Sequence, residues 1–315
     1  MEDDVFGPQA YEIFNEIEYH AEKRFHEYHP TFGPRPEFFV RLRDWLDSAV
    51  DEEDQKKLLQ LVCHIFFAGI ADFNALYRAA YQGPVKRWLV DQENLDITSD
   101  TLSSSIEAGA KQTWFCPITD SMQISSFYHV NKIVGRNERP DWHSLSILGD
   151  RDKIARYVDK RSIKRIVLLE DFVGSGSQML RAIKFAATIP NISILLLPMI
   201  VCPAGFRIGQ NLAAYYGNVD FVGLLPLPRQ TFIADAPYPG ENPFYAEIRE
   251  LACRIYTTVS GRASPDGNVK PYGPYGFAKT GGLTVPYANC PDNTLPLIHY
   301  TSDKWKALFP RSTRI

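Results

Sequence analysis

Residues 165–179 (RIVLLEDFVGSGSQM) combine two adjacent acidic residues with a loop rich in glycine and serine. Glu170 and Asp171 follow an apolar run that predicts a buried strand, so we expect their carboxylates at its carboxyl end. Gly174 and Gly176 permit backbone angles that other residues avoid, and they let a ligand come close to the loop. The segment therefore predicts a ligand site at the end of a strand.

The residues after these glycines supply groups that bind anions. Ser175, Ser177 and Gln178 carry side-chain donors, and a helix predicted from about Ser177 would direct its free N–H groups into the same space. Two carboxylates beside an anion are costly unless ribose hydroxyls or a metal ion engage them. The combination therefore predicts an anionic ligand that comes with hydroxyl groups, as in a phosphorylated ribose, or with a metal ion.

Two familiar phosphate-binding loops are excluded. A dinucleotide-binding loop requires G-x-G-x-x-G with an acidic residue some twenty positions later; here Met179 replaces the third glycine and the acidic residues come first. A P-loop requires Gly-Lys-Ser/Thr, and the segment has no lysine.

The segment resembles the phosphoribosyl-pyrophosphate loop of type I phosphoribosyltransferases, in which an apolar strand, two acidic residues, three variable residues and Ser/Thr-Gly follow in order. The resemblance implies that Glu170 and Asp171 are catalytic residues holding the ribose hydroxyls. It further implies that the loop cradles the 5′-phosphate, with Gly174, Ser175, Gly176, Ser177 and Gln178 as its members. Mg²⁺ would be bound through the ligand, and the reaction would be transfer of phosphoribose to an unidentified acceptor.

A second resemblance keeps another function open. EDFVGSGS (170–177) also lines up with the D-P-F-x-G-S-G-T loop of amino-DNA methyltransferases, which binds S-adenosylmethionine. These enzymes carry a D-P-P-Y motif, of which residues 235–238 (DAPY) are an imperfect version. Asp171 stands where this loop has proline, which favours the ribose-phosphate interpretation.

The C-terminal residues 272–300 resemble the tail of a bacterial phosphoribosyltransferase-like family linked with defence and conflict gene clusters, some associated with retrons. That tail has a Gly-Phe loop, a strand and the motif Asn-x-Pro-Asn-Asn-Thr-Leu-Pro, to which residues 289–296 (NCPDNTLP) correspond. The resemblance spans about residues 110–310 and implies a role in bacterial defence. Asn289, Asp292 and Asn293 follow a predicted strand, where they either line the pocket or shape a turn.

Asp120 and Ser121 follow the predicted strand 113–118, at the position where phosphoribosyltransferases place a pyrophosphate-binding loop; capping of the next helix accounts for them equally well. The nearest following basic residue is Lys132. A loop without a cation favours a non-catalytic module that senses a nucleotide and acts through a partner protein or nucleic acid, so this alternative to an enzyme stays open.

Apolar strands alternate with helices in the rest of the chain. This pattern predicts an α/β fold, phosphoribosyltransferase-like and Rossmann-like, with a mainly parallel sheet covered by helices. Residues 1–110 read as a helical region without strands, and residues 111–315 as the α/β domain. The predicted strands are 113–118, 165–169, 192–201, 219–225 and 283–287; the predicted helices include 120–134, 177–187, 203–216 and 244–258.

Composition excludes several other classes of protein. A net charge of −3 provides no global basic field, although Lys160, Arg161, Lys164 and Arg165 form a local cluster. The longest apolar stretch, 192–203, is too short to span a bilayer, and no secretory signal is recognisable at the N-terminus. Five scattered cysteines indicate reduced thiols. We therefore expect a cytoplasmic protein without a membrane partner.

Overall fold

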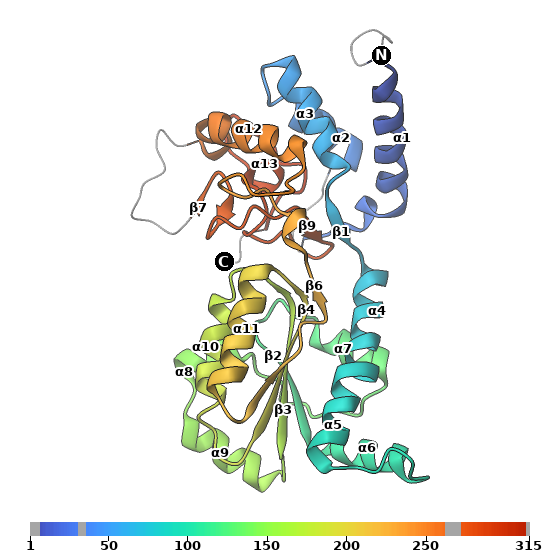
Figure 1. The fold of residues 1–315 in the computed structure, drawn as a ribbon, viewed down its shortest axis with the longest axis vertical. Coiled ribbons are helices and arrows are strands. Elements are labelled where there is room, and N and C mark those ends of the chain that lie inside the picture. Colours follow the sequence, from blue (N-terminus) through green and yellow to red (C-terminus); the bar gives the residue numbers. More distant parts are fainter. Residues whose placement is uncertain (1–6, 31–35, 262–271, 313–315) are drawn as a thin grey trace. The chain divides into compact units, whose positions relative to one another are not determined.

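The computed structural model describes residues 7–30, 36–261 and 272–312. They form two compact units, one made of residues up to 70 together with those from 228 onward, the other of residues 71–227. The boundary expected at 110/111 lies inside the second unit, because residues 71–110 pack with the sheet that follows them. Figure 1 shows the order of the elements along the chain.

The second unit contains a parallel sheet, as the sequence predicted. Its strands are β2 (Thr113–Pro117), β3 (Arg165–Val173), β4 (Ser193–Val201), β5 (Val219–Phe221) and β6 (Leu225–Pro226). Their order is β2-β3-β4-β5, with β6 also beside β4, and every pairing is parallel. β3 and β4 are almost entirely buried, which explains their uninterrupted apolar sequences.

Helices cover both faces of this sheet (Figure 1). The alternation of side chains along β2 and β3 directs Trp114, Ile166 and Leu168 into a core shared with the helices on one face. Phe115 points to the other face, where its ring contacts those of Tyr81 and Phe127. The helices are α4 (Ile70–Ala80), α5 (Lys86–Glu93), α6 (Leu102–Lys111), α7 (Ile124–Asn131), α8 (Trp142–Leu148), α9 (Arg151–Lys160), α10 (Ser177–Ala186) and α11 (Pro203–Tyr215), with a π-helical turn, η2 (Tyr81–Val85), joining α4 to α5.

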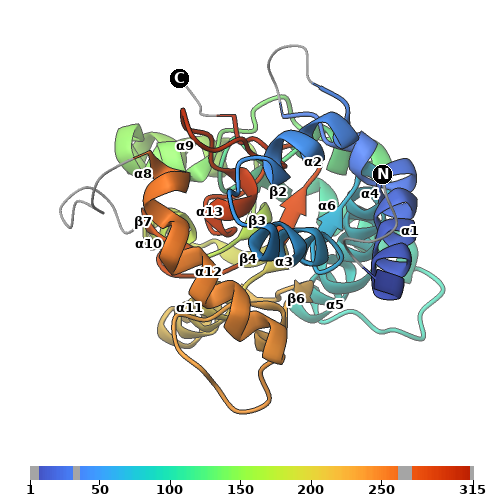
Figure 2. The same cartoon turned by 90° about the horizontal axis from the view of Figure 1, so that it is seen from above.

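The first unit is mainly helical around an aromatic core that includes Phe25, Trp45 and Phe309. α3 and α12 lie side by side, joined by an ion pair of 2.5 Å between Asp54 and Arg254 (Figures 1 and 2). The helices are α1 (Gly7–Lys23), η1 (Phe25–Glu27), α2 (Phe38–Leu46), α3 (Glu52–Val62), η3 (Arg229–Thr231), α12 (Pro243–Ser260) and α13 (Pro296–His299). The strands are β1 (Phe66–Ala68), β7 (Tyr272–Gly273), β8 (Gly276–Phe277) and β9 (Thr284–Pro286).

Two expectations about strands were wrong. β1 lies in the region expected to contain no strand, and β9, expected in the main sheet, pairs in parallel with β1. Both segments have only three residues in strand conformation, and their pairing joins positions more than 200 residues apart. Hydrophobic periodicity within a short window therefore could not predict these strands or their pairing. Among the described helices, none is long and apolar enough to cross a membrane.

Candidate functional site

The predicted site lies where β3 meets α10. The acidic pair stands within β3, because the strand continues beyond Leu169 and pairs with β4 as far as Val173 and Val201. A loop of three residues then leads to α10, which begins at Ser177 as predicted. Gly176 precedes the helix with a φ of 79°, a left-handed angle that glycine adopts without strain.

Glu170 is buried and hydrogen-bonded to the loop that follows β2. Its side chain accepts from the backbone N–H of Thr119 at 2.8 Å and from the hydroxyl groups of Thr119 and Ser121, the latter at 3.1 Å. The residue is only 4% exposed. Both oxygens of its carboxyl group thus have partners within the protein, so Glu170 anchors the loop 119–121 to the sheet.

Asp171 has a different environment. Its Oδ1 accepts from the Ser121 hydroxyl at 3.0 Å and from the backbone N–H of Phe172 at 2.8 Å, and the residue is half-buried. The Ser121 hydroxyl therefore lies between the two acidic side chains; it can donate its single proton to one of them, and the second contact requires a proton on a carboxyl group. The two acidic residues, which looked equivalent in the sequence, therefore differ: the carboxyl group of Glu170 is buried, and that of Asp171 is partly exposed.

The two carboxyl groups also differ in charge. Burial, and after it the negative charge of Asp171, raises the pKa of Glu170 to about 8, against the opposing effect of hydrogen bonds from Thr119 and Ser121. At neutral pH Glu170 is accordingly mostly protonated. The acidic pair then carries about one negative charge in place of two, which reduces the repulsion that a bound phosphate would meet.

The loop after β3 is braced by α11. The backbone N–H of Gly205 donates to the carbonyl oxygen of Gly174 at 3.0 Å. A Cβ added at Gly205 would lie 2.6 Å from Val173 Cγ1 and 2.9 Å from that same oxygen, so this close approach requires glycine. Ser177 and Gln178 are exposed in the first turn of α10, whose N–H groups have no partner within the helix. This arrangement can bind an anion.

The predicted loop residues Asp120 and Ser121 lie at the same edge of the sheet. Ser121 contacts the acidic pair, whereas Asp120 is exposed beside it. Neither residue caps α7, since that helix begins at Ile124 with Gln123 as its N-cap, so the capping interpretation was wrong. Thr119, the first residue of this loop, was not predicted as a site residue, yet it makes two hydrogen bonds to Glu170. No local pattern indicated this contact, because it depends on the parallel register of β2 and β3, which brings the residues after Pro117 beside those after Leu169.

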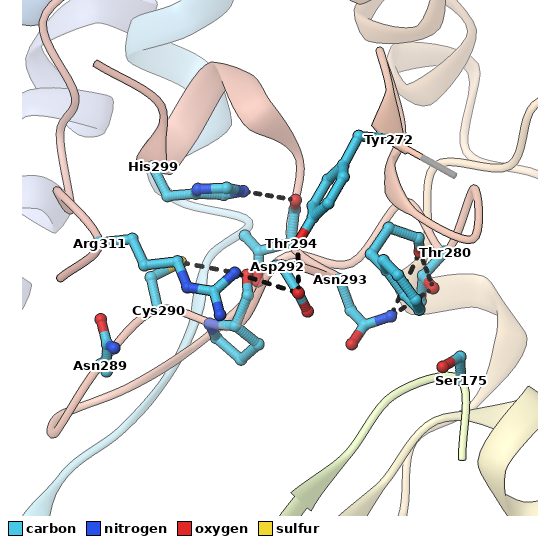
Figure 3. A network of polar contacts seen from close by, with 12 residues as sticks. Ser175, Tyr272, Thr280, Asn289, Cys290, Asp292, Asn293, Thr294, His299 and Arg311 are labelled. Atoms are coloured by element: carbon cyan, nitrogen blue, oxygen red, sulfur yellow. Dashed lines mark hydrogen bonds and ion pairs between the residues drawn. The ribbon is translucent and has the colours of Figure 1, made fainter. Parts of the chain in front are cut away.

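Asn289, Asp292 and Asn293 belong to the first unit, where they form a network of polar contacts (Figure 3). Asn289 exchanges two hydrogen bonds with the backbone of Ser312, at 3.0 and 3.1 Å. The remaining partners are Tyr272 (2.7 Å) and Arg311 (3.2 Å) for Asp292, and Thr280 (2.9 Å) and the Phe277 carbonyl (3.2 Å) for Asn293. These are contacts that shape a turn, and the pocket role stays a prediction.

A metal ion at this site would need a bound molecule to supply some of its ligands. The described residues contain no group of three His, Cys, Asp or Glu side chains placed to hold one. Mg²⁺ is commonly bound by one or two carboxylates together with substrate phosphates. The half-buried Asp171 near the carboxyl end of β3 fits that pattern, because the ligand itself would supply most of the oxygens.

A carboxylate pair at the end of a central parallel strand, followed by a Gly-Ser loop at a helix N-terminus, is the arrangement of phosphoribosyltransferase-like proteins. Comparison with protein families agrees: residues 42–311 match the PRTase-CE family. This match covers most of the chain, and the protein therefore belongs to the PRTase-CE family, a phosphoribosyltransferase-like family. No curated protein matches the chain, and no solved structure does.

Proposed function

We propose that this protein binds phosphoribosyl pyrophosphate or a related ribose phosphate at the carboxyl end of β3. The observation that carries the proposal is the half-buried Asp171 followed by a glycine-serine loop at the N-terminus of α10. Membership of a phosphoribosyltransferase-like family supports it. The same match argues against S-adenosylmethionine as the ligand.

Each part of the site has a role in this proposal. Asp171 accepts hydrogen bonds from the ribose hydroxyls, and residues 174–178 donate to the 5′-phosphate. Glu170 acts indirectly by fixing the loop 119–121, whose Ser121 hydroxyl contacts Asp171. Mg²⁺ held by Asp171 and by ligand oxygens would offset the charge of the pyrophosphate.

Calorimetric titration tests the ligand. Phosphoribosyl pyrophosphate with Mg²⁺ should bind, and Asp171→Asn should weaken it about 10- to 150-fold, since a hydrogen bond to a charged group contributes about 1.5–3 kcal/mol. Asp159→Asn, an exposed aspartate before β3, serves as the matched control and should leave the affinity unchanged. Binding of S-adenosylmethionine alone would overturn the proposal, as would equal affinities of the Asp171 variant and wild type.

A non-catalytic sensing module is the second candidate, and one observation favours it. The loop between β2 and α7 has no lysine or arginine, and its hydroxyl groups on Thr119 and Ser121 are bonded to the acidic pair. A leaving pyrophosphate would therefore meet no cation from this loop. Release of pyrophosphate over time, measured with candidate base and nucleotide acceptors, distinguishes turnover from ligand binding alone.

We also propose a role in bacterial defence, which the resemblance of residues 272–300 to the tail of conflict-associated proteins supports. In this role the bound ribose phosphate or nucleotide would control an effector, acting alone or through a partner protein or nucleic acid. Phage plating on cells that carry the gene together with its genomic neighbours tests it. Protection should be lost with Asp171→Asn and kept with Asp100→Asn, which changes an exposed aspartate away from the site.

A further inference from the structure

The amino end of the sheet in the second unit carries a concentration of positive charge. Three segments lie there: 107–112 at the end of α6, 132–139 after α7, and 156–164 at the end of α9. They contain eight Lys or Arg residues and three Asp or Glu residues, whereas the whole chain has a net charge of −3. We refer to these three segments as the basic edge.

Hydrogen bonds show that the three segments adjoin one another. Arg136 Nη2 donates to the carbonyl oxygens of Lys111 at 3.2 Å and Arg161 at 3.3 Å. The backbone N–H of Lys164 donates to the carbonyl oxygen of Gln112 at 2.9 Å. Lys111 and Lys164 stand just before β2 and β3, so the basic edge is at the end of these strands opposite to Asp171.

Most of this charge is not paired with carboxylates. Within the described part of the chain, the basic edge has one ion pair, between Arg161 and Glu138 at 3.6 Å, and both side chains are half-exposed. Lys111, Lys160 and Lys164 are exposed and make no ion pair there. Surface charges in such a cluster repel one another unless an anion is bound.

Two adjoining recesses open along residues 132–139. One, of about 220 Å³, has Lys111 and Arg136 in its lining, and the other, of about 540 Å³, has Lys132 and Arg139; both share Tyr128. Nε of Arg136 is buried and has no hydrogen-bond partner among the described residues. The first recess is smaller than sites for drug-sized ligands, typically about 300–1,000 Å³, and so suits one small anionic group.

We propose that the basic edge binds the phosphate backbone of a nucleic acid. A regularly charged strand can occupy adjoining recesses with successive phosphates while exposed lysines contact the flanking ones. No exposed aromatic side chain is present in these segments of the described structure, so binding is through the backbone and independent of sequence. A membrane surface fits less well, because Val134 is the sole large apolar residue exposed there.

Fluorescence anisotropy with a labelled single strand about 20 nucleotides long, and with the corresponding duplex, tests this proposal. The variant Lys111→Glu/Lys164→Glu should bind the single strand at least about tenfold more weakly at about 50 mM salt. On the single strand it should also reduce the magnitude of the slope of log K against log[salt] by about 1.4, or about 0.7 for each phosphate contact. Lys153→Glu/Lys184→Glu makes the same change in charge at exposed lysines outside the basic edge and should shift affinity less than about twofold.

Further measurements distinguish a nucleic-acid surface from a misfolded variant and from a surface that binds any polyanion. Circular dichroism should show that both variants are folded, and their affinity for phosphoribosyl pyrophosphate should equal that of wild type, because the two sites lie at opposite ends of the strands. The proposal is overturned if wild type binds neither nucleic acid, if both variants lose affinity equally, or if polyglutamate or phosphatidylserine vesicles bind as tightly with the same dependence on Lys111 and Lys164.

Discussion

Replacing Glu170 by glutamine should stabilise the protein at alkaline pH. The buried carboxyl group has a pKa of about 8, whereas a glutamate in the unfolded chain has an ordinary value near 4.5. Between these values the native state holds a proton that the unfolded chain has released. The free energy of unfolding should therefore fall as pH rises through this window, by at most about 5 kcal/mol.

Glutamine is the suitable substitution because it has nearly the same shape and no charge. Its carbonyl oxygen can accept from the backbone N–H of Thr119, and its amide can donate to the hydroxyl groups of Thr119 and Ser121, which also accept hydrogen bonds. We expect the variant to be within about 1 kcal/mol of wild type at about pH 5 and about 4 kcal/mol more stable at about pH 8.5.

Urea unfolding followed by tryptophan fluorescence measures this difference at each pH. Titrating groups far from Glu170 contribute equally to both proteins, so subtracting wild type from variant isolates the titration of Glu170 and of Asp171, whose charge acts on it. Glu107→Gln, at an exposed position of α6, is the control and should give a difference that does not change with pH. A flat difference for Glu170→Gln from about pH 5 to about pH 8.5 would refute the claim that burial keeps this group protonated.

Three other outcomes are expected. Gly176→Ala should lose about 1–2 kcal/mol of stability and its affinity for ribose phosphate, because φ is positive at this position and the new Cβ would lie 3.2 Å from Ile208. The control Gly217→Ala, whose new Cβ meets no atom within 4 Å, should match wild type in both urea unfolding and calorimetry. Asn289→Ala should lower the free energy of unfolding by about 1–3 kcal/mol through its two bonds to Ser312, whereas lost ligand affinity at unchanged stability would assign it to the pocket. Burial lowers the pKa of His299 to about 4. As pH falls from about 6.5 to about 4, unfolding measurements should therefore show that wild type loses about 3 kcal/mol more stability than His299→Gln; equal losses would contradict this.

The sequence predicted best those features that depend on neighbouring residues. Local signals predicted the buried strand β3, the glycine loop with Gly174 and Gly176, and the start of α10 at Ser177. The structure confirms the strand, the loop and the helix in this order along the chain. α8 and α9 also begin at local signals. Asp141 and Asp150 cap these helices by accepting from the backbone N–H groups of Ser144 and Lys153.

Features that depend on distant residues could not be predicted in this way. The partner of Glu170 is Thr119, 51 positions earlier, and β1 pairs with β9 across more than 200 residues. No periodicity within a short window records such pairings. The burial of Glu170 also depends on the continuation of β3 to Val173, because a strand that ended at Leu169 would have left both carboxylates at its open end.

This burial bears on the choice between the two ligands that the sequence left open. The methyltransferase loop has its acidic residue at the position of Glu170 and proline at the position of Asp171. In the structure the first position is occupied by a buried carboxyl group bonded to Thr119 and Ser121, and mostly protonated at neutral pH. The negative charge nearest the glycine-serine loop is therefore that of Asp171, at the position where the methyltransferase pattern has no charge. A site of this kind favours hydroxyl groups next to a phosphate, as in a ribose phosphate.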